Sequence, residues 1–136
     1  MSQRNRSTYY IKPYHWRLEG KWKEIHLSRL KFVKKYIKCK DHVLDVGCGD
    51  GYLTNLLSSS VMQVVGVDTS FSALSFAKEM VKGVHFILAS ALNLPFIQQC
   101  FDVAVAIEVI EHLDPTEVNR FISEVHQSLR KGVNLF

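Results

Sequence analysis

The feature that most constrains this chain is a short apolar run that leads directly into three alternate glycines. Residues 43–51 read Val-Leu-Asp-Val-Gly-Cys-Gly-Asp-Gly, and a helix is expected to begin near Tyr52. Glycines at this spacing allow a tight strand-to-helix turn and let a ligand lie against backbone amides. The pattern predicts a binding loop for a carboxylate or a phosphate.

An acidic residue follows at a distance that bears on the ligand. Asp68 ends the next apolar segment, 21 residues after Gly47, where a carboxylate can accept hydrogen bonds from both hydroxyls of a ribose. The glycine spacing is GxGxG, with Tyr52 where a dinucleotide fingerprint has its last glycine, so pyrophosphate is disfavoured. A nucleoside ligand is indicated. The alternative is a structural glycine turn with Asp68 as a helix cap.

Four short apolar segments rich in β-branched residues predict the strands. Their side chains are apolar almost without alternation, which is typical of strands covered on both faces, and the intervening segments carry helical spacing. We therefore expect an α/β fold with a parallel sheet. The predicted strands are Val43–Val46, Val64–Val67, Val84–Leu88 and Val103–Ile107.

Three helices are predicted around these strands. Ser70 can cap a helix that reaches Lys82, with one apolar face of Phe71, Leu74, Ala77 and Val81. Asp114, Pro115 and Glu117 form a capping box for a helix that Gly132 ends, and its apolar stripe is Val118, Phe121, Ile122, Val125 and Leu129. An earlier amphipathic helix is expected to pack on the sheet through Trp22, Ile25, Leu30, Val33 and Ile37.

The length and composition bound the class of protein. A chain of 136 residues with 47% apolar content suits one core, and no signal peptide or membrane-length apolar run is present. Its three cysteines form no CxxC pair, so neither a disulfide framework nor a cysteine zinc site is indicated. We expect a soluble, cytoplasmic protein with reduced thiols.

Charge divides the chain into two parts of opposite sign. Residues 1–40 hold 12 of the 17 Lys and Arg and only two acids, whereas residues 41–136 hold 5 bases and 11 acids. We treat residues 1–19 as a basic, aromatic arm and residues 20–136 as the domain. The arm could contact nucleic acid, or it could lie on its own domain. Its aromatic residues, for which docking on the core is the favoured role, are Tyr9, Tyr10, Tyr14, His15 and Trp16.

Four segments in order now resemble one known family, the class I S-adenosylmethionine-dependent methyltransferases. Residues 43–51 resemble the family's first motif, and residues 64–70 resemble its ribose-binding motif. Residues 90–96 resemble the adenine-side loop of the small-molecule group, and residues 101–113 resemble the fourth-strand motif. The resemblance implies a Rossmann-like fold with sheet order 3-2-1-4 and S-adenosylmethionine as the cofactor.

The resemblance also implies a role for individual residues. Asp45, Glu108 and the loop backbone would face the methionine end, Asp68 would hold the ribose, and Thr69 would lie beside the adenine. Ser90 and the Ala91 amide would take the place of an acid that family members commonly have in the adenine loop. The predicted loop contacts are Gly47, Cys48, Gly49 and Gly51.

Catalytic and metal-binding residues are less clearly indicated. Methyl transfer needs mainly placement of the two reactants, with a base only for weakly acidic acceptors. Glu108 and His112 are the candidates, although a structural hydrogen bond would explain His112 equally well. Glu108, Glu111 and His112 resemble the magnesium pattern of small-RNA 2′-O-methyltransferases, but the same wording is ordinary in metal-independent members, so no metal is favoured.

The last residues depart from the family pattern. Members continue through further strands, whereas this chain reads Leu129-Arg-Lys-Gly-Val-Asn-Leu-Phe136, so we expect strand five to be absent and strand four to form an open edge that could pair with a second copy. Three functions stay open: a methyltransferase for a small or other acceptor, a non-catalytic cofactor-binding or partner-binding module, and an RNA methyltransferase using the basic arm. The acceptor itself is unknown.

Overall fold

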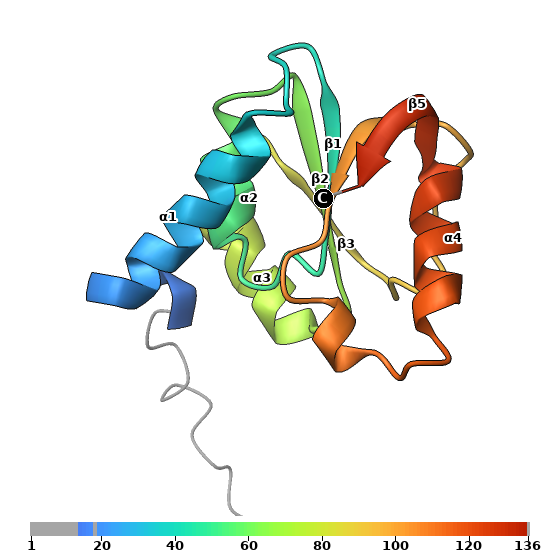
Figure 1. Cartoon of the computed structure of the whole chain (residues 1–136). Coiled ribbons are helices and arrows are strands. Elements are labelled where there is room, and N and C mark those ends of the chain that lie inside the picture. Colours follow the sequence, from blue (N-terminus) through green and yellow to red (C-terminus); the bar gives the residue numbers. More distant parts are fainter. Residues whose placement is uncertain (1–13, 18, 136) are drawn as a thin grey trace, which may run out of the picture.

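The computed structural model describes residues 14–17 and 19–135, and Figure 1 shows their arrangement. The strands are β1 (His42–Val46), β2 (Gln63–Asp68), β3 (His85–Leu88), β4 (Phe101–Val105) and β5 (Leu129–Leu135). They form one sheet of order β3-β2-β1-β4-β5, in which every neighbouring pair is parallel. The α/β fold class and the four predicted strands are confirmed.

Helices connect and cover these strands. They are α1 (Gly20–Lys34), α2 (Tyr52–Ser58), α3 (Phe71–Met80) and α4 (Val118–Ser128), with short 3-10 turns η2 (Tyr14–Arg17) and η3 (Ile110–His112). None of the helices in the described ranges has the length and hydropathy that crossing a bilayer requires.

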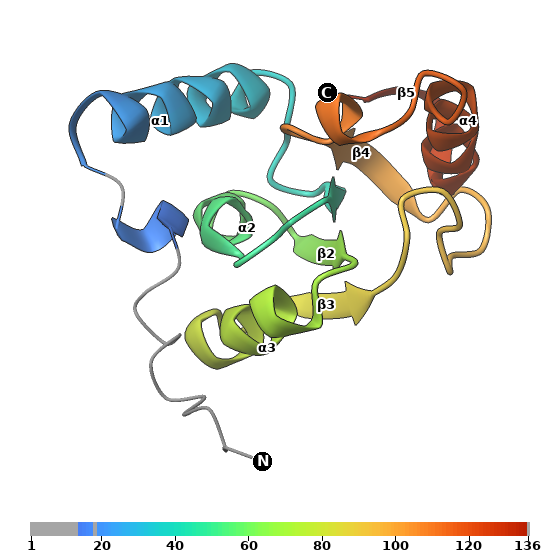
Figure 2. The same ribbon diagram turned by 90° about the horizontal axis from the view of Figure 1, so that it is seen from below.

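The nearly unbroken apolar strands are explained by helices on both faces of the sheet. Alternate side chains of a strand point to opposite faces. In β1, Val43 packs with Leu30 and Val33 of α1, whereas Leu44 and Val46 pack with Phe121 and Val125 of α4. Figure 2 shows α1, α2 and α3 on one side of the strands and α4 on the other. The prediction that the first helix packs on the sheet is confirmed.

The predicted start signals of two helices operate as expected, with small shifts. The Ser70 side chain accepts a hydrogen bond from the Ala73 amide, which caps α3. The Glu117 carboxylate accepts from the Asp114 amide at 3.0 Å, which is one half of the predicted capping box, although α4 begins only at Val118. Phe71 is 73% exposed, so its predicted place on the buried face of α3 is wrong.

The end of the chain differs from the sequence expectation. α4 ends at Ser128, and residues 129–135 form β5 instead of continuing the helix to Gly132. Gly132 lies inside β5 with a φ of +81°, near the register shift between Phe101 and Val103 of β4. A glycine of positive φ is typical of a bulge, which the helical spacing of the preceding residues concealed. The expectation that β4 forms the sheet edge is therefore wrong, and β5 covers it.

One residue of the aromatic arm is described in detail. Trp16 packs edge-on against Tyr52 and Phe76, with ring centroids 5.4 and 5.9 Å apart, and its Nε1 donates to the Asp50 carbonyl at 3.1 Å. This contact agrees with the favoured docking role. Tyr9, Tyr10 and the side chains of Tyr14, His15 and Trp22 lie outside the described residues.

Candidate functional site

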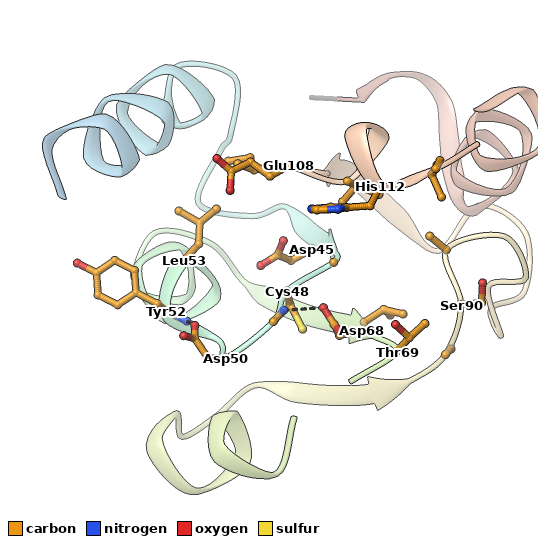
Figure 3. Close-up of a pocket in the computed structure, with 18 of the residues that line it drawn as sticks. Asp45, Cys48, Asp50, Tyr52, Leu53, Asp68, Thr69, Ser90, Glu108 and His112 are labelled. Atoms are coloured by element: carbon orange, nitrogen blue, oxygen red, sulfur yellow. Dashed lines mark hydrogen bonds between the residues drawn. The ribbon is translucent and has the colours of Figure 1, made fainter. Parts of the chain in front are cut away.

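A cavity of about 460 Å³ opens where the carboxyl ends of the strands meet, which is where open parallel sheets bind ligands. Figure 3 shows Asp45 near its centre, Asp68 and Thr69 on one side, and Glu108 and His112 on the other. Most of the predicted site residues line this one cavity: Asp45, Gly47, Cys48, Gly49, Asp68, Thr69, Ser90, Ala91, Glu108 and His112. Of the predicted cofactor contacts, only Gly51 does not line it.

The three glycines of the loop meet different structural requirements. Gly47 and Gly51 have φ values of +72° and +76°, where side chains are strained. A Cβ on Gly47 would lie 2.6 Å from Val109 Cγ2, and one on Gly51 would lie 2.8 Å from the Ala77 Cβ. A Cβ on Gly49 would meet no atom within 4 Å. Gly51 therefore serves helix packing, whereas the backbone at Gly49 is open to a ligand.

Asp45 is a buried carboxylic acid beneath the cavity. Its side chain accepts a hydrogen bond from the Thr54 hydroxyl at 2.7 Å, and the residue is only 2% exposed. Burial raises the pKa of Asp45 to about 7; the Thr54 hydrogen bond partly opposes this shift, and the negative charge of Asp68 adds to it. A cation bound above Asp45 would favour its ionised form.

Asp68 is held in a fixed position at the end of β2. One carboxylate oxygen accepts from the Gly49 amide at 2.8 Å and the other accepts from the Ser70 amide at 2.8 Å. Each oxygen retains a further lone pair for a ligand hydroxyl. The alternative is a structural glycine turn in which Asp68 only caps a helix. It explains these contacts in part, because Gly49 and Asp68 also line the cavity.

The far wall is the loop that follows β3. The Ser90 hydroxyl accepts from the Leu92 amide at 3.1 Å, and the Leu94 amide donates to a Glu124 carboxylate oxygen at 2.8 Å. The first bond fixes the turn of the loop itself, and the second holds the loop against α4. Ser90, Ala91 and Leu92 thereby present a mixed polar and apolar surface beside Asp68, whose carbonyl accepts from the Ala89 amide at 3.0 Å.

Glu108 lies at the junction of two cavities. Its φ of +59° places it in the left-handed region, a strain that non-glycine residues often carry at functional sites. Its carboxylate pairs with the Arg29 guanidinium of α1. It lines both the main cavity and a second one of about 360 Å³, whose other residues are Arg29, Phe32, Val33, Ile107 and Glu111.

The three residues of the metal-like pattern are divided between these cavities. His112 lines only the main cavity, Glu111 lines only the second, and Glu108 lines both. Among the described residues, no group of three or more His, Cys, Asp or Glu side chains is arranged to hold a metal ion. The backbone amide of His112 donates to the Val109 carbonyl at 3.0 Å, which closes η3.

Sequence reasoning missed His26. It belongs to α1, is 9% exposed and lines the main cavity. The sequence signal was its place on the apolar side of the predicted helix, four residues before Leu30. Tyr52 and Leu53, at the start of α2, also line the cavity and were not predicted as site residues.

The charge of the cavity selects among ligands. Among the described residues, its lining includes the acids Asp45, Asp50, Asp68 and Glu108 and no Lys or Arg. Such a lining disfavours a polyphosphate and suits a nucleoside with cationic groups. Cys48 is buried, and burial together with the charges of Asp45 and Asp68 raises the pKa of its thiol well above the usual range, so a nucleophilic thiolate is not available there.

Fold and site together define a nucleoside-binding domain of the Rossmann-like type, and comparison with known proteins identifies the family. The family described as "Methyltransferase domain" matches residues 44–136. A ubiquinone biosynthesis O-methyltransferase of Coxiella burnetii is 34% identical over 130 residues, covering 89% of this chain and 54% of that protein. The chain thus spans about half the length of the curated relatives it matches.

Solved structures agree with this match. A Pyrococcus horikoshii protein superposes with a TM-score of 0.81 at 29% identity, covering 96% of this chain and 64% of that one. A Haemonchus contortus phosphoethanolamine N-methyltransferase, solved with S-adenosylhomocysteine, shares the fold, with a TM-score of 0.73 at 18% identity, 83% of this chain and 25% of that one. The chain belongs to the S-adenosylmethionine-dependent methyltransferase family.

Proposed function

We propose that this chain binds S-adenosylmethionine in the main cavity and transfers its methyl group to a small molecule. The observation that carries the proposal is the cavity itself, which lies on the glycine loop and which the described part of the chain lines with four acids and no Lys or Arg. S-adenosylmethionine combines a nucleoside with an ammonium and a sulfonium group, so its charge complements this lining. Family membership supports the same ligand.

The residues would divide the cofactor between them. Asp68 accepts hydrogen bonds from the ribose hydroxyls, and Thr69 with the Ser90–Ala91 backbone borders the adenine. The loop of Gly47, Cys48 and Gly49 and the carboxylates of Asp45 and Glu108 receive the methionine end. Asp45 fits this role because a nearby ammonium would stabilise the ionised form of a carboxyl whose pKa is about 7.

The chemistry requires little from the protein beyond placement. When bound, the cofactor supplies a methyl group on a positively charged sulfur that leaves as a neutral thioether. The residues described here hold the donor and exclude water from it, which is the main contribution expected in such transfers. Binding the acceptor and removing its proton are separate tasks.

A small-molecule acceptor is supported by the relatives. The matched Coxiella burnetii protein is named an O-methyltransferase of ubiquinone biosynthesis, which makes a hydroxyl group the first acceptor class to test. The RNA alternative rested on a metal site and on the basic arm. Glu111 and His112 line different cavities, so their arrangement does not support the metal site that the RNA alternative requires.

Three earlier expectations stay predictions. We retain the division into an arm of residues 1–19 and a domain of residues 20–136, and nucleic-acid contact through the basic arm as the alternative to docking of the arm on its own domain. A cytoplasmic location is supported by the three cysteines, which are all free.

The assay that tests the proposed function follows the methyl group. Purified protein is incubated with S-adenosylmethionine labelled in the methyl group and with separate metabolite, RNA and protein fractions. We expect label in the metabolite fraction. Label only in RNA would overturn the small-molecule acceptor, and cofactor binding without any transfer would identify a non-catalytic module.

A further inference from the structure

A buried histidine that the proposed function does not yet use lines the main cavity. His26 comes from α1, a helix that precedes the segment matched by the family. Asp45, Asp50, Asp68, Glu108 and His112 line the same cavity. His26 and His112 are the two imidazole side chains of this lining, and imidazole is the side chain most often used for proton transfer.

α1 is anchored so that His26 is held in place. Leu30 and Val33, one and two turns further along, are 6% and 4% exposed and pack against β1, β2 and β4. Arg29 lies one turn from His26 and pairs with Glu108 at the end of β4. The helix that carries His26 is thus fixed by two packed residues and an ion pair, which supplies the rigid support that a proton-transfer group needs.

The second cavity lies directly beside this position. It shares Ile107 and Glu108 with the main cavity, and its wall includes Phe32 and Val33. Phe32 is 51% exposed, and its ring centroid lies 5.2 Å from that of Tyr36. This exposed aromatic surface is suited to contact with a flat ring. Glu108 and Glu111 outnumber Arg29, so the cavity disfavours carboxylate or phosphate groups.

We propose that His26 faces the transferable methyl group and accepts the proton of a neutral hydroxyl acceptor, whose apolar or aromatic body occupies the second cavity. This inference depends on the proposed methyltransferase function. The acceptor oxygen forms a bond to the methyl carbon while the carbon–sulfur bond breaks and its electron pair passes to sulfur. The hydroxyl proton passes to a ring nitrogen of His26, which later releases it to water.

The position of His26 can be tested without knowing the acceptor. S-adenosylmethionine and S-adenosylhomocysteine differ by one methyl group and one positive charge, located at the sulfur. Protein saturated with each is titrated between pH 5 and 8 while the ring signals of the six histidines are followed by NMR. A His26→Gln variant assigns its signal.

We expect the titration midpoint of His26 to be lower with S-adenosylmethionine by at least about 0.5 pH unit, the effect of a charge at about 6 Å even in water. His126, exposed on α4, should titrate identically in both complexes and serves as the internal control. Repeating both titrations in Asp45→Asn protein removes the contribution of the Asp45 carboxyl to the midpoint of His26. Equal His26 midpoints in the two complexes would overturn the proposal, whereas failure of both ligands to bind would overturn the proposed function instead.

Transfer to a neutral phenol tests the remaining step. With catechol as the probe, His26→Gln should lose about 100-fold in single-turnover rate while keeping its affinity for S-adenosylmethionine, and His126→Gln should match wild type. No transfer to catechol by cofactor-bound protein would overturn the acceptor class. Loss in His112→Gln but not in His26→Gln would assign the proton to His112 and overturn the role of His26.

Discussion

The carboxylate of Asp45 and the hydroxyl of Thr54 form a 2.7 Å hydrogen bond that is buried beneath the main cavity. The pair joins the end of β1 to α2, the two elements that flank the glycine loop. A carboxyl group with a single neutral partner in such a place is costly to ionise. This cost makes both stability and cofactor binding depend on pH.

Stability should fall as the pH rises through the range in which Asp45 ionises. Its pKa is about 7 in the folded chain against 3.8 as the reference value, so the folded state binds more protons between these limits. The free energy of unfolding therefore decreases from pH 4 to pH 7, by on the order of 4 kcal/mol from this group alone. Urea unfolding of wild-type and Asp45→Asn protein between pH 4 and pH 7 measures this decrease in the free energy of unfolding. A wild-type slope that persists in Asp45→Asn would contradict the assignment.

Asp102 should show the opposite pH dependence. Burial opposes its ionisation, but hydrogen bonds from the His42 amide, the Arg130 guanidinium and the His42 ring outweigh burial and lower its pKa. The stability that Asp102 contributes is present above its unfolded pKa of 3.8 and is lost as the pH falls through the lower folded pKa. Asp102→Ala should cost about 1 to 2 kcal/mol at pH 7, since the His42 amide would lose its 2.8 Å partner. An equal cost at pH 7 and pH 2.5 would argue against this explanation.

Gly47 should be intolerant of even one methyl group. Gly47→Ala would combine a strained φ of +72° with a contact of 2.6 Å to Val109. We expect the free energy of unfolding to fall by about 2 to 4 kcal/mol, compared with about 1 kcal/mol for the strained backbone conformation alone. Gly83→Ala is the matched control, because Gly83 has a φ of +74° and nothing within 4 Å of the added carbon. Thermal unfolding of both variants measures the difference. Equal losses of stability in Gly47→Ala and Gly83→Ala would show that the Val109 contact is unimportant.

Trp16 should report on the loop that it contacts. Its Nε1 donates to the carbonyl of Asp50, a residue that lines the cavity. In Trp22→Phe protein, Trp16 is the sole tryptophan, and its emission should change when S-adenosylmethionine saturates the site. Trp16→Phe should lower stability by about 1 kcal/mol through loss of the hydrogen bond. An emission spectrum identical with and without bound cofactor would contradict a coupling between Trp16 and the loop.

Local patterns predicted most of the fold and one side of the site. The glycine loop follows β1 and Asp68 ends β2. The carboxyl ends of parallel strands lie at the same edge of the sheet, so the two features could be predicted to lie together. The resemblance then indicated Ser90, Ala91 and Glu108 as cofactor contacts, and all three line the cavity. These positions depend on short segments whose geometry is determined by their own residues.

The remaining features depend on contacts between distant residues. His26 reaches the cavity only because Leu30 and Val33 fix the packing of α1 on the sheet. β5 was missed because Leu129 continues the helical spacing of Val125, whereas pairing with β4 determines its actual structure. Phe71 satisfies the same periodicity as Leu74, but no element of the described residues covers it, and it is exposed.

Calorimetric titration with S-adenosylmethionine tests the central claim most directly. We predict a single site in the folded protein, with affinity lowered about 10- to 100-fold in Asp68→Ala, because the ribose hydroxyls would lose their charged acceptor. Circular dichroism establishes that the variant is folded, since Asp68 also accepts from Gly49 and Ser70. The absence of binding by folded wild-type protein, or an affinity unchanged in Asp68→Ala, would contradict the account.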